Sequence, residues 1–196
     1  MTYGSAFDIK DWSVYQELGL TREHIPELIK MIGDEELHQA DSESSEVWAS
    51  LHAWRTLGML QAAEAVPALL DLLYRVDEYD DDWISEDLPK VFALIGEPAI
   101  RELSRYAGDT ARTLYARSAA ASGLSHIGRK HPETREACVA GIEKALAQYR
   151  RNDPILNGLF VGDLLDFKAA EAFPTIQQAH QDNGNGKKYK KCCLNK

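Results

Sequence analysis

Apolar residues recur along most of this chain at intervals of three and four positions, which is the period of an amphipathic helix. The clearest runs are Ile25, Leu28, Ile29 and Ile32, and Val66, Leu69, Leu70 and Leu73. The pattern predicts helices near residues 8–18, 22–32, 43–58, 62–76, 83–95, 97–107, 110–128, 132–149, 154–166 and 169–180. The fold class that follows is all-α.

The predicted helices belong to an internal repeat. Residues 62–69 read AAEAVPAL, and residues 169–176 read AAEAFPTI. Each segment fits a short turn followed by a helix with proline in its first turn. The preceding helices finish with an apolar residue and a glycine, at Leu18-Gly19, Leu57-Gly58, Ile95-Gly96 and Ile127-Gly128, and with Leu165-Asp166 in the last unit. Because glycine tolerates the left-handed conformation, we expect the helices to end at these positions.

The second members of these pairs are spaced by 39, 38, 32 and 38 residues. Two helices per repeat at such a period are typical of an α-solenoid. A proline near the start of the second helix makes the pattern similar to HEAT repeats, in particular to the short HEAT-like units related to the bilin lyases. That proline is Pro26, Pro67 or Pro174. The third unit has Arg101 at this place, and in the fourth Pro132 comes early. The resemblance implies an α-solenoid of about five helical hairpins over residues 1–180, followed by a short flexible tail.

The end of the chain has a different character. Residues 181–193 read QDNGNGKKYKKCC and resemble, without a gap, the SEC-C motif CPCGSGKKYKKCC. The intact motif binds zinc, but Gln181 and Asn183 replace its first two cysteines here. Cys192 and Cys193 therefore form only half of a site, and amide side chains are poor zinc ligands. We expect no bound cofactor and a disordered basic tail over residues 181–196.

The resemblance also implies partners for the tail. Intact SEC-C motifs are similar to the zinc-binding end of the preprotein translocase ATPase, which contacts an export chaperone and ribosomes. A bacterial group of unknown function joins HEAT-like repeats to this motif, and the chain resembles that group. The side chains left for an electrostatic contact to RNA or an acidic surface are Lys187, Lys188, Tyr189, Lys190 and Lys191.

The charge of the chain is unevenly distributed. The net charge is −9, and residues 181–196 hold five lysines and one aspartate, so residues 1–180 carry −9 − 4 = −13. A body of this charge repels nucleic-acid backbones. No apolar run approaches the ~20 residues of a membrane span, and the first residues do not have the pattern of a signal peptide. Three cysteines make no disulfide framework, so we expect a cytoplasmic protein that does not enter membranes.

Acidic side chains cluster over residues 77–82, which read DEYDDD. The run contains no glycine, so it does not fit an EF-hand calcium loop. We expect a solvated loop in which Asp81 or Asp82 caps the next helix. The alternative is a docking patch, formed by Asp80, Asp81 and Asp82, for a basic partner or for the chain's own lysine-rich tail.

Aromatic and histidine side chains provide the remaining candidates. Trp48 and His52 lie one helical turn apart, so we expect an exposed pair that contacts a partner. Trp54 belongs to an apolar stripe and should be buried. Three further aromatic residues should close the seams between repeats: Trp12, Tyr15 and Trp83. His126 and Cys138 fall in different elements and predict no metal site, and Cys138 fits a core position.

The sequence contains no nucleophile elbow, dinucleotide fingerprint or paired-histidine metal signature. We therefore expect a non-catalytic scaffold that binds a protein or peptide on the concave face of the array, which second helices line in HEAT-like folds. The positions expected to be exposed there are Glu27, Lys30, Asp71, Arg75, Glu102, Arg105 and Glu143. The alternatives are a bilin-lyase-like or other small-ligand enzyme, and a nucleic-acid or ribosome contact through the tail.

Overall fold

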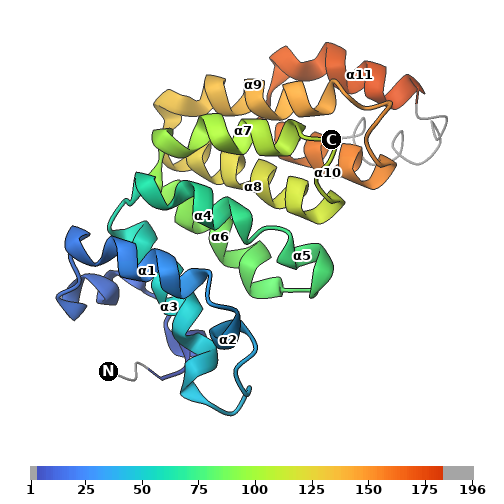
Figure 1. The fold of residues 1–196 in the computed structure, drawn as a ribbon. Coiled ribbons are helices and arrows are strands. Elements are labelled where there is room, and N and C mark those ends of the chain that lie inside the picture. Colours follow the sequence, from blue (N-terminus) through green and yellow to red (C-terminus); the bar gives the residue numbers. More distant parts are fainter. Residues whose placement is uncertain (1–3, 183–196) are drawn as a thin grey trace.

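The computed structural model describes residues 4–182, which contain helices and no β-strand, as the sequence predicts (Figure 1). The α-helices are α1 (Ile25–Ile32), α2 (Glu35–His38), α3 (Ala49–Met59), α4 (Val66–Asp71), α5 (Arg75–Glu78), α6 (Asp82–Ile95), α7 (Ile100–Gly108), α8 (Leu114–Lys130), α9 (Arg135–Leu146), α10 (Pro154–Asp166) and α11 (Phe173–Asp182). Short 3₁₀ helices precede or join them: η1 (Ala6–Asp8), η2 (Trp12–Leu18), η3 (Arg22–His24), η4 (Ser45–Trp48), η5 (Ala63–Ala65), η6 (Glu97–Ala99), η7 (Pro132–Thr134) and η8 (Ala170–Ala172).

The structure differs from the expected helices in three places. The first segment is the 3₁₀ helix η2, which ends at Gly19 with φ 70°. The helix expected over residues 62–76 ends at Asp71, and the separate turn α5 follows it. Helix α2 was not predicted, because four residues are too short to show a helical period. It forms where the Asp34 side chain caps the chain by accepting a hydrogen bond from Glu36 N at 2.9 Å.

The internal repeat extends to the backbone hydrogen bonds. Gln61 and Lys168 both adopt the left-handed conformation, with φ 50° and 52°. Just after Gln61, Ala62 N donates to Leu57 O, and the equivalent bond near the chain end joins Ala169 N to Leu164 O, each at 3.0 Å. These are the bonds of a Schellman motif. The helix stops of these two units are therefore Gln61 and Lys168.

Gly58 and Gly128 do not end their helices as expected, whereas α10 does end at Asp166. Helix α3 continues to Met59 and α8 to Lys130, so both glycines lie inside helices. The physical reason for glycine at these two positions is close packing. A Cβ on Gly58 would lie 3.1 Å from Leu94 Cδ1, and one on Gly128 would lie 2.8 Å from the Phe167 ring.

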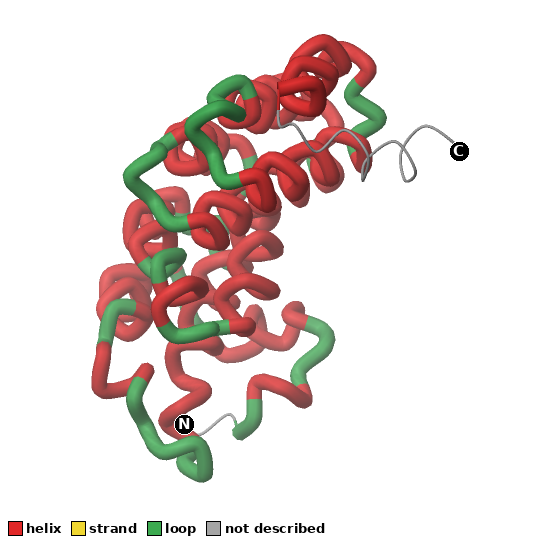
Figure 2. Tube along the Cα trace, turned by 90° about the vertical axis from the view of Figure 1, so that its right-hand side faces the viewer, coloured by secondary structure: helices red, strands yellow, loops and turns green. Residues whose placement is uncertain are grey.

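The longer helices alternate between two rows, so that each packs on the equivalent helix of the next unit (Figure 1). In one row η2, α3, α6, α8 and α10 each contact the next element, and in the other row α1, α4, α7, α9 and α11 do the same. The stack bends into an open arc (Figure 2). One core runs between the rows, and Trp54 is fully buried in it, as predicted, together with Phe92 and Phe160. Cys138 is also buried in this core, as predicted.

Polar side chains link each unit to the next across about one repeat. Asp77 accepts hydrogen bonds from Thr113 Oγ1 at 2.7 Å and from Ala116 N at 2.8 Å. The carboxylate of one unit thus caps helix α8 of the next, whose own cap residue makes no side-chain cap bond. Arg135 and Glu171 form an ion pair of 2.7 Å in the same way.

Several expectations concern residues outside the described range. They involve Asn183, Lys187, Lys188, Tyr189, Lys190, Lys191, Cys192 and Cys193, which follow the last residue that the structure describes. Gln181 lies on the exposed side of α11. Within residues 4–182, no helix combines the length and the apolar character that crossing a membrane requires.

We expect Asp77→Ala to lower the free energy of unfolding by about 1–2 kcal/mol, because it removes the cap of α8. The matched control is Glu78→Ala, which removes the same charge from the next, exposed position and should change stability by less than about 0.5 kcal/mol. Urea denaturation followed by circular dichroism measures both. Equal effects of the two substitutions would contradict the capping role of Asp77.

Candidate functional site

Trp48 and His52 do not form the exposed pair that the sequence suggested. Both are partly buried. Trp48 packs edge-to-face on Trp83, with ring centroids 5.5 Å apart. His52 Nε2 donates to Gly4 O at 3.0 Å, so its Nδ1 accepts from the Tyr15 hydroxyl at 2.8 Å. Burial lowers the pKa of His52, which keeps its ring neutral near pH 7. His52 thus holds the N-terminal segment against α3, and Trp48 packs η4 against α6.

The acidic run is divided between structural and exposed roles. Asp81 caps α6, as predicted, by accepting a hydrogen bond from Ile84 N at 3.2 Å. Asp80 and Asp82 are exposed, and Asp80 occupies a left-handed turn with φ 51°. The docking patch proposed for these three residues is therefore reduced to two exposed carboxylates.

The second helices carry a hollow of about 480 Å³ between α4 and α7. Three of the positions expected on the binding face, Asp71, Glu102 and Arg105, line it. Its charges are largely paired within the chain, because Arg105 binds Glu102 and Arg112 binds Asp109. Arg75, expected on the same face, is buried and binds Glu35 at 2.9 Å. Most of the charge that lines this hollow is therefore compensated within the chain.

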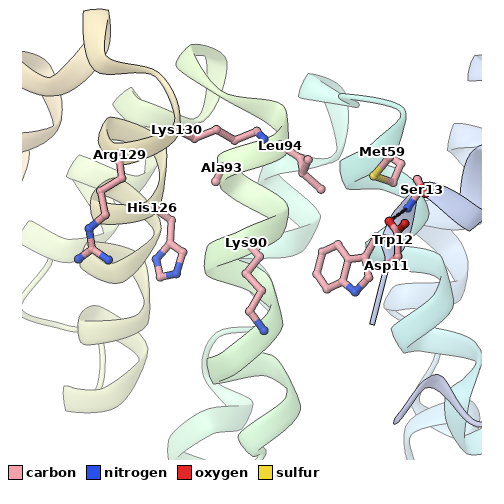
Figure 3. A pocket seen from close by; sticks show the side chains of 10 residues that line it. All are labelled: Asp11, Trp12, Ser13, Met59, Lys90, Ala93, Leu94, His126, Arg129 and Lys130. Atoms are coloured by element: carbon pink, nitrogen blue, oxygen red, sulfur yellow. Dashed lines mark hydrogen bonds between the residues drawn. The ribbon is translucent and has the colours of Figure 1, made fainter. Parts of the chain in front are cut away.

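A second surface, on the row of first helices, is more distinctive. A hollow of about 580 Å³ opens across η2, α3, α6 and α8 (Figure 3). Its apolar lining comes from Trp12, Met59, Ala93 and Leu94, and its polar lining from Asp11, Ser13, Lys90, His126, Arg129 and Lys130. We call this hollow the cationic cleft, because it holds three cations and one carboxylate.

A smaller hollow of about 370 Å³ adjoins the cationic cleft and shares Trp12 and Lys90 with it. The two hollows together extend across α6 from the N-terminal segment to α8. Figure 3 shows Lys90 on α6 between His126 on one side and Trp12 on the other. A surface of this kind suits an extended chain better than a compact small molecule.

A buried ion pair supports the cleft from below. Arg55 Nε donates to Asp87 Oδ2 at 2.6 Å, and both side chains are only 4% exposed. Trp54 Nε1 donates to the same oxygen at 3.3 Å, and Lys90 Nζ lies 3.4 Å from the other one. Because one carboxylate is shared by Arg55 and Lys90, this group has a net positive charge. Arg55 also donates to Ala6 O at 2.7 Å, which fixes the N-terminal segment.

The other side of the cleft is ordered by α8. His126 Nδ1 lies 2.8 Å from Ser122 O, and since a carbonyl only accepts, this nitrogen carries the proton. His126 Nε2 then remains as an acceptor for a ligand when the ring is neutral. Arg129 is held at 3.1 Å from Asp166 on α10. The arrangement can bind carboxylates beside aromatic and apolar side chains.

The sequence reasoning missed this cleft. It placed Trp12 in a seam and did not single out Lys90, Arg129 or Lys130. A signal was available, because Lys90 and Arg129 are 39 residues apart, close to one repeat. Equivalent positions of successive repeats lie side by side in a stack. Positive charge at both Lys90 and Arg129, in a chain that is otherwise acidic, could have indicated a basic surface.

Metal chemistry has no support among the residues described. Within residues 4–182, no three His, Cys, Asp or Glu side chains gather closely enough to hold an ion. The half-site of Cys192 and Cys193 lies outside this range. Known proteins offer no further guide, because no protein-family model, curated protein or solved structure matches the chain.

Asp163 on α10 binds Ser125 of α8 and predicts a pH dependence of stability. Burial raises the pKa of Asp163 to about 6, although a hydrogen bond from Ser125 and the charge of Arg129 oppose the rise. The fold therefore favours the protonated carboxyl. The stability that the protonated Asp163 carboxyl provides is complete below pH 3.8, the ordinary pKa of aspartate. It is lost as the pH rises through the raised pKa of about 6.

We expect Asp163→Asn, which stays neutral, to raise the free energy of unfolding at pH 8 by about 1–3 kcal/mol and to change it little at pH 4. Urea denaturation across this range measures the difference. Glu136→Gln on the exposed side of α9 serves as the control. A variant that parallels the wild type at every pH would refute the burial of a charge at this position.

The buried pair gives a second prediction. Asp87→Asn leaves the Arg55 charge buried without a counter-charge, and we expect it to cost about 3 kcal/mol of unfolding free energy. The exposed neighbour Glu86 offers the control Glu86→Gln, with an expected change below about 0.5 kcal/mol. Thermal and urea unfolding measure both variants. If Asp87→Asn were as stable as the wild type, the buried pair would not support the cleft.

Proposed function

We propose that the chain is a non-catalytic scaffold that binds an acidic segment of a partner protein along the cationic cleft. The observation that carries this proposal is the position of Lys90, Arg129 and Lys130 around one partly apolar hollow. Arg129 is paired with Asp166, but Lys90 shares Asp87 with Arg55, so an excess of positive charge remains beside Lys130. Residues 1–180 carry a net charge of −13, so a local gathering of cations is unlike the rest of the body. An acidic ligand would be steered to it.

In this proposal the architecture is a HEAT-like α-solenoid. Three observations support it: the two rows of stacked helices, the helix stops repeated at Gln61 and Lys168, and the polar links across one repeat. A stacked array offers an extended surface made from equivalent positions of successive units. The cationic cleft crosses four such units on the row of first helices, whereas the sequence suggested the row of second helices.

The partner's chemistry follows from the lining of the cleft. Lysine and arginine side chains select carboxylates, and Trp12, Met59 and Leu94 offer an apolar surface between them. The ligand that fits is an extended peptide in which acidic and apolar residues alternate. The lysine-rich residues 187–191 supply an accessory contact of the same sign, so one acidic partner can engage both.

The test is fluorescence anisotropy with a labelled peptide of about 12 residues that alternates glutamate and leucine. We expect saturable binding that weakens with salt, and a loss of about tenfold or more in affinity for Lys90→Glu combined with Lys130→Glu. The matched control is Lys144→Glu on α9, an exposed lysine outside the cleft, which should bind nearly as the wild type does.

Two results would overturn the proposal. One is an affinity for the acidic peptide that does not change in the double variant. The other is binding of a single-stranded RNA oligonucleotide that is tighter than peptide binding and lost in the same variant, because the cleft would then serve a nucleic acid. A neutral peptide of the same length tests whether charge is required.

A further inference from the structure

Helix α10 is apolar on its solvent side as well as on its core side. Its inner face buries Leu156, Phe160 and Leu164. On the opposite side, Ile155 is 57% exposed, Leu159 38% and Leu165 46%. A helix that is apolar all round is normally covered on every side. Nothing within residues 4–182 covers this one.

Two glycines lie among the exposed apolar side chains. At 100° per residue, Gly158 and Gly162 fall on the same face as Ile155. A Cβ built on Gly162 would meet no atom within 4 Å. The packing of a single chain therefore does not require glycine at position 162. Because glycine destabilises the interior of a helix, its presence there calls for another reason. We call Ile155, Gly158, Leu159, Gly162 and Leu165 the outer stripe of α10.

We propose that the outer stripe is the contact of a two-fold homodimer, in which α10 packs antiparallel on α10 of a second copy. A two-fold axis near position 160 brings together residues whose numbers add to 320. Ile155 then faces the partner's Leu165, and Gly158 faces the partner's Gly162. The bare glycine backbones let the helices approach closely, so the exposed leucines pack across the axis.

Charges at the two ends of α10 fit this pairing. Arg151 and Asp153 are exposed before the helix, and Asp166 and Lys168 are exposed at its other end. Asp153 caps α10 and Asp166 binds Arg129, but the Asp166 side chain is still 67% exposed and can accept a further partner. The antiparallel arrangement brings Arg151 toward the partner's Asp166 and Asp153 toward the partner's Lys168. A parallel arrangement would instead oppose like charges. Antiparallel helix dipoles also attract each other. The stripe and its flanks are thus complementary to a second copy of themselves.

The proposed contact is small, because it uses a single helix of 13 residues from each copy. It falls at the low end of interface sizes, below about 1,200 Å² in total, and such contacts are weak. We therefore expect a dimer that forms at micromolar concentrations and dissociates on dilution.

Sedimentation velocity of the full chain between about 2 and 200 µM tests the proposal. We expect the wild type to shift from monomer to dimer over this range and Leu159→Glu to remain monomeric. The control Tyr115→Glu places the same charge on another exposed residue, half exposed on α8, and should dimerise as the wild type does. A wild type that stays monomeric, or a dimer that Leu159→Glu does not affect, overturns the proposal.

Gly162→Ala separates a binding role from a folding role. In dilute solution, where the chain is monomeric, the added methyl group should raise the midpoint of urea unfolding, because it finds free space and favours the helix. In concentrated solution it should weaken the dimer, because it separates the two helices. A variant that dimerises as the wild type does contradicts the glycine contact.

A chain that ends at residue 182 tests whether residues 183–196, rather than a second copy, cover the outer stripe. We expect it to dimerise as the full chain does. If only the shortened chain dimerises, residues 183–196 cover the outer stripe in the full chain, and the proposal is wrong.

Discussion

Close packing between helices of successive units is the constraint on which the structure depends. A Cβ on Gly141 of α9 would overlap Ser104 of α7, and one on Gly128 of α8 would overlap the ring of Phe167. The buried face of α8 is built largely from Ala116, Ala119, Ala120 and Ala121. Small residues at these contacts let the helices approach until backbone meets side chain. The distance between neighbouring units thus depends on the glycine and alanine residues at their contacts.

This spacing determines what the surface can do. Lys90 on α6 and the basic pair at the end of α8 surround one hollow because their helices lie side by side. The Arg55–Asp87 pair then fixes the N-terminal segment, with Trp12, at the edge of that hollow. The cleft is therefore a product of the stack and of one buried charge pair. Neither α6 nor α8 could form it alone.

The helices and the core could be read from the sequence because they depend on local periodicity. Trp54 and Cys138 are buried as their positions in apolar stripes predicted. Gly58 was misread, because a glycine after an apolar residue has two causes, a left-handed turn or a close neighbour, and only the structure distinguishes them. The left-handed residue that ends α3 is Gln61, which has no sequence signal of its own.

The cleft escaped prediction for a different reason. Its residues come from four elements, and a property of the assembled surface leaves only a weak trace in any one segment. Likewise, nothing local indicated that Asp77 caps a helix of the next unit or that His52 binds the N-terminal segment. Long-range polar contacts of this kind depend on the register between repeats, which periodicity alone does not give.

The most direct test of the stack is hydrogen exchange measured by mass spectrometry on the wild type and on Gly141→Ala. If each unit depends on close contact with its neighbours, the added methyl group will speed exchange in α7, α8 and α9 and leave α1 and α3 protected. Faster exchange spread evenly over all helices would contradict a linear stack. Unchanged exchange throughout would contradict the close contact itself.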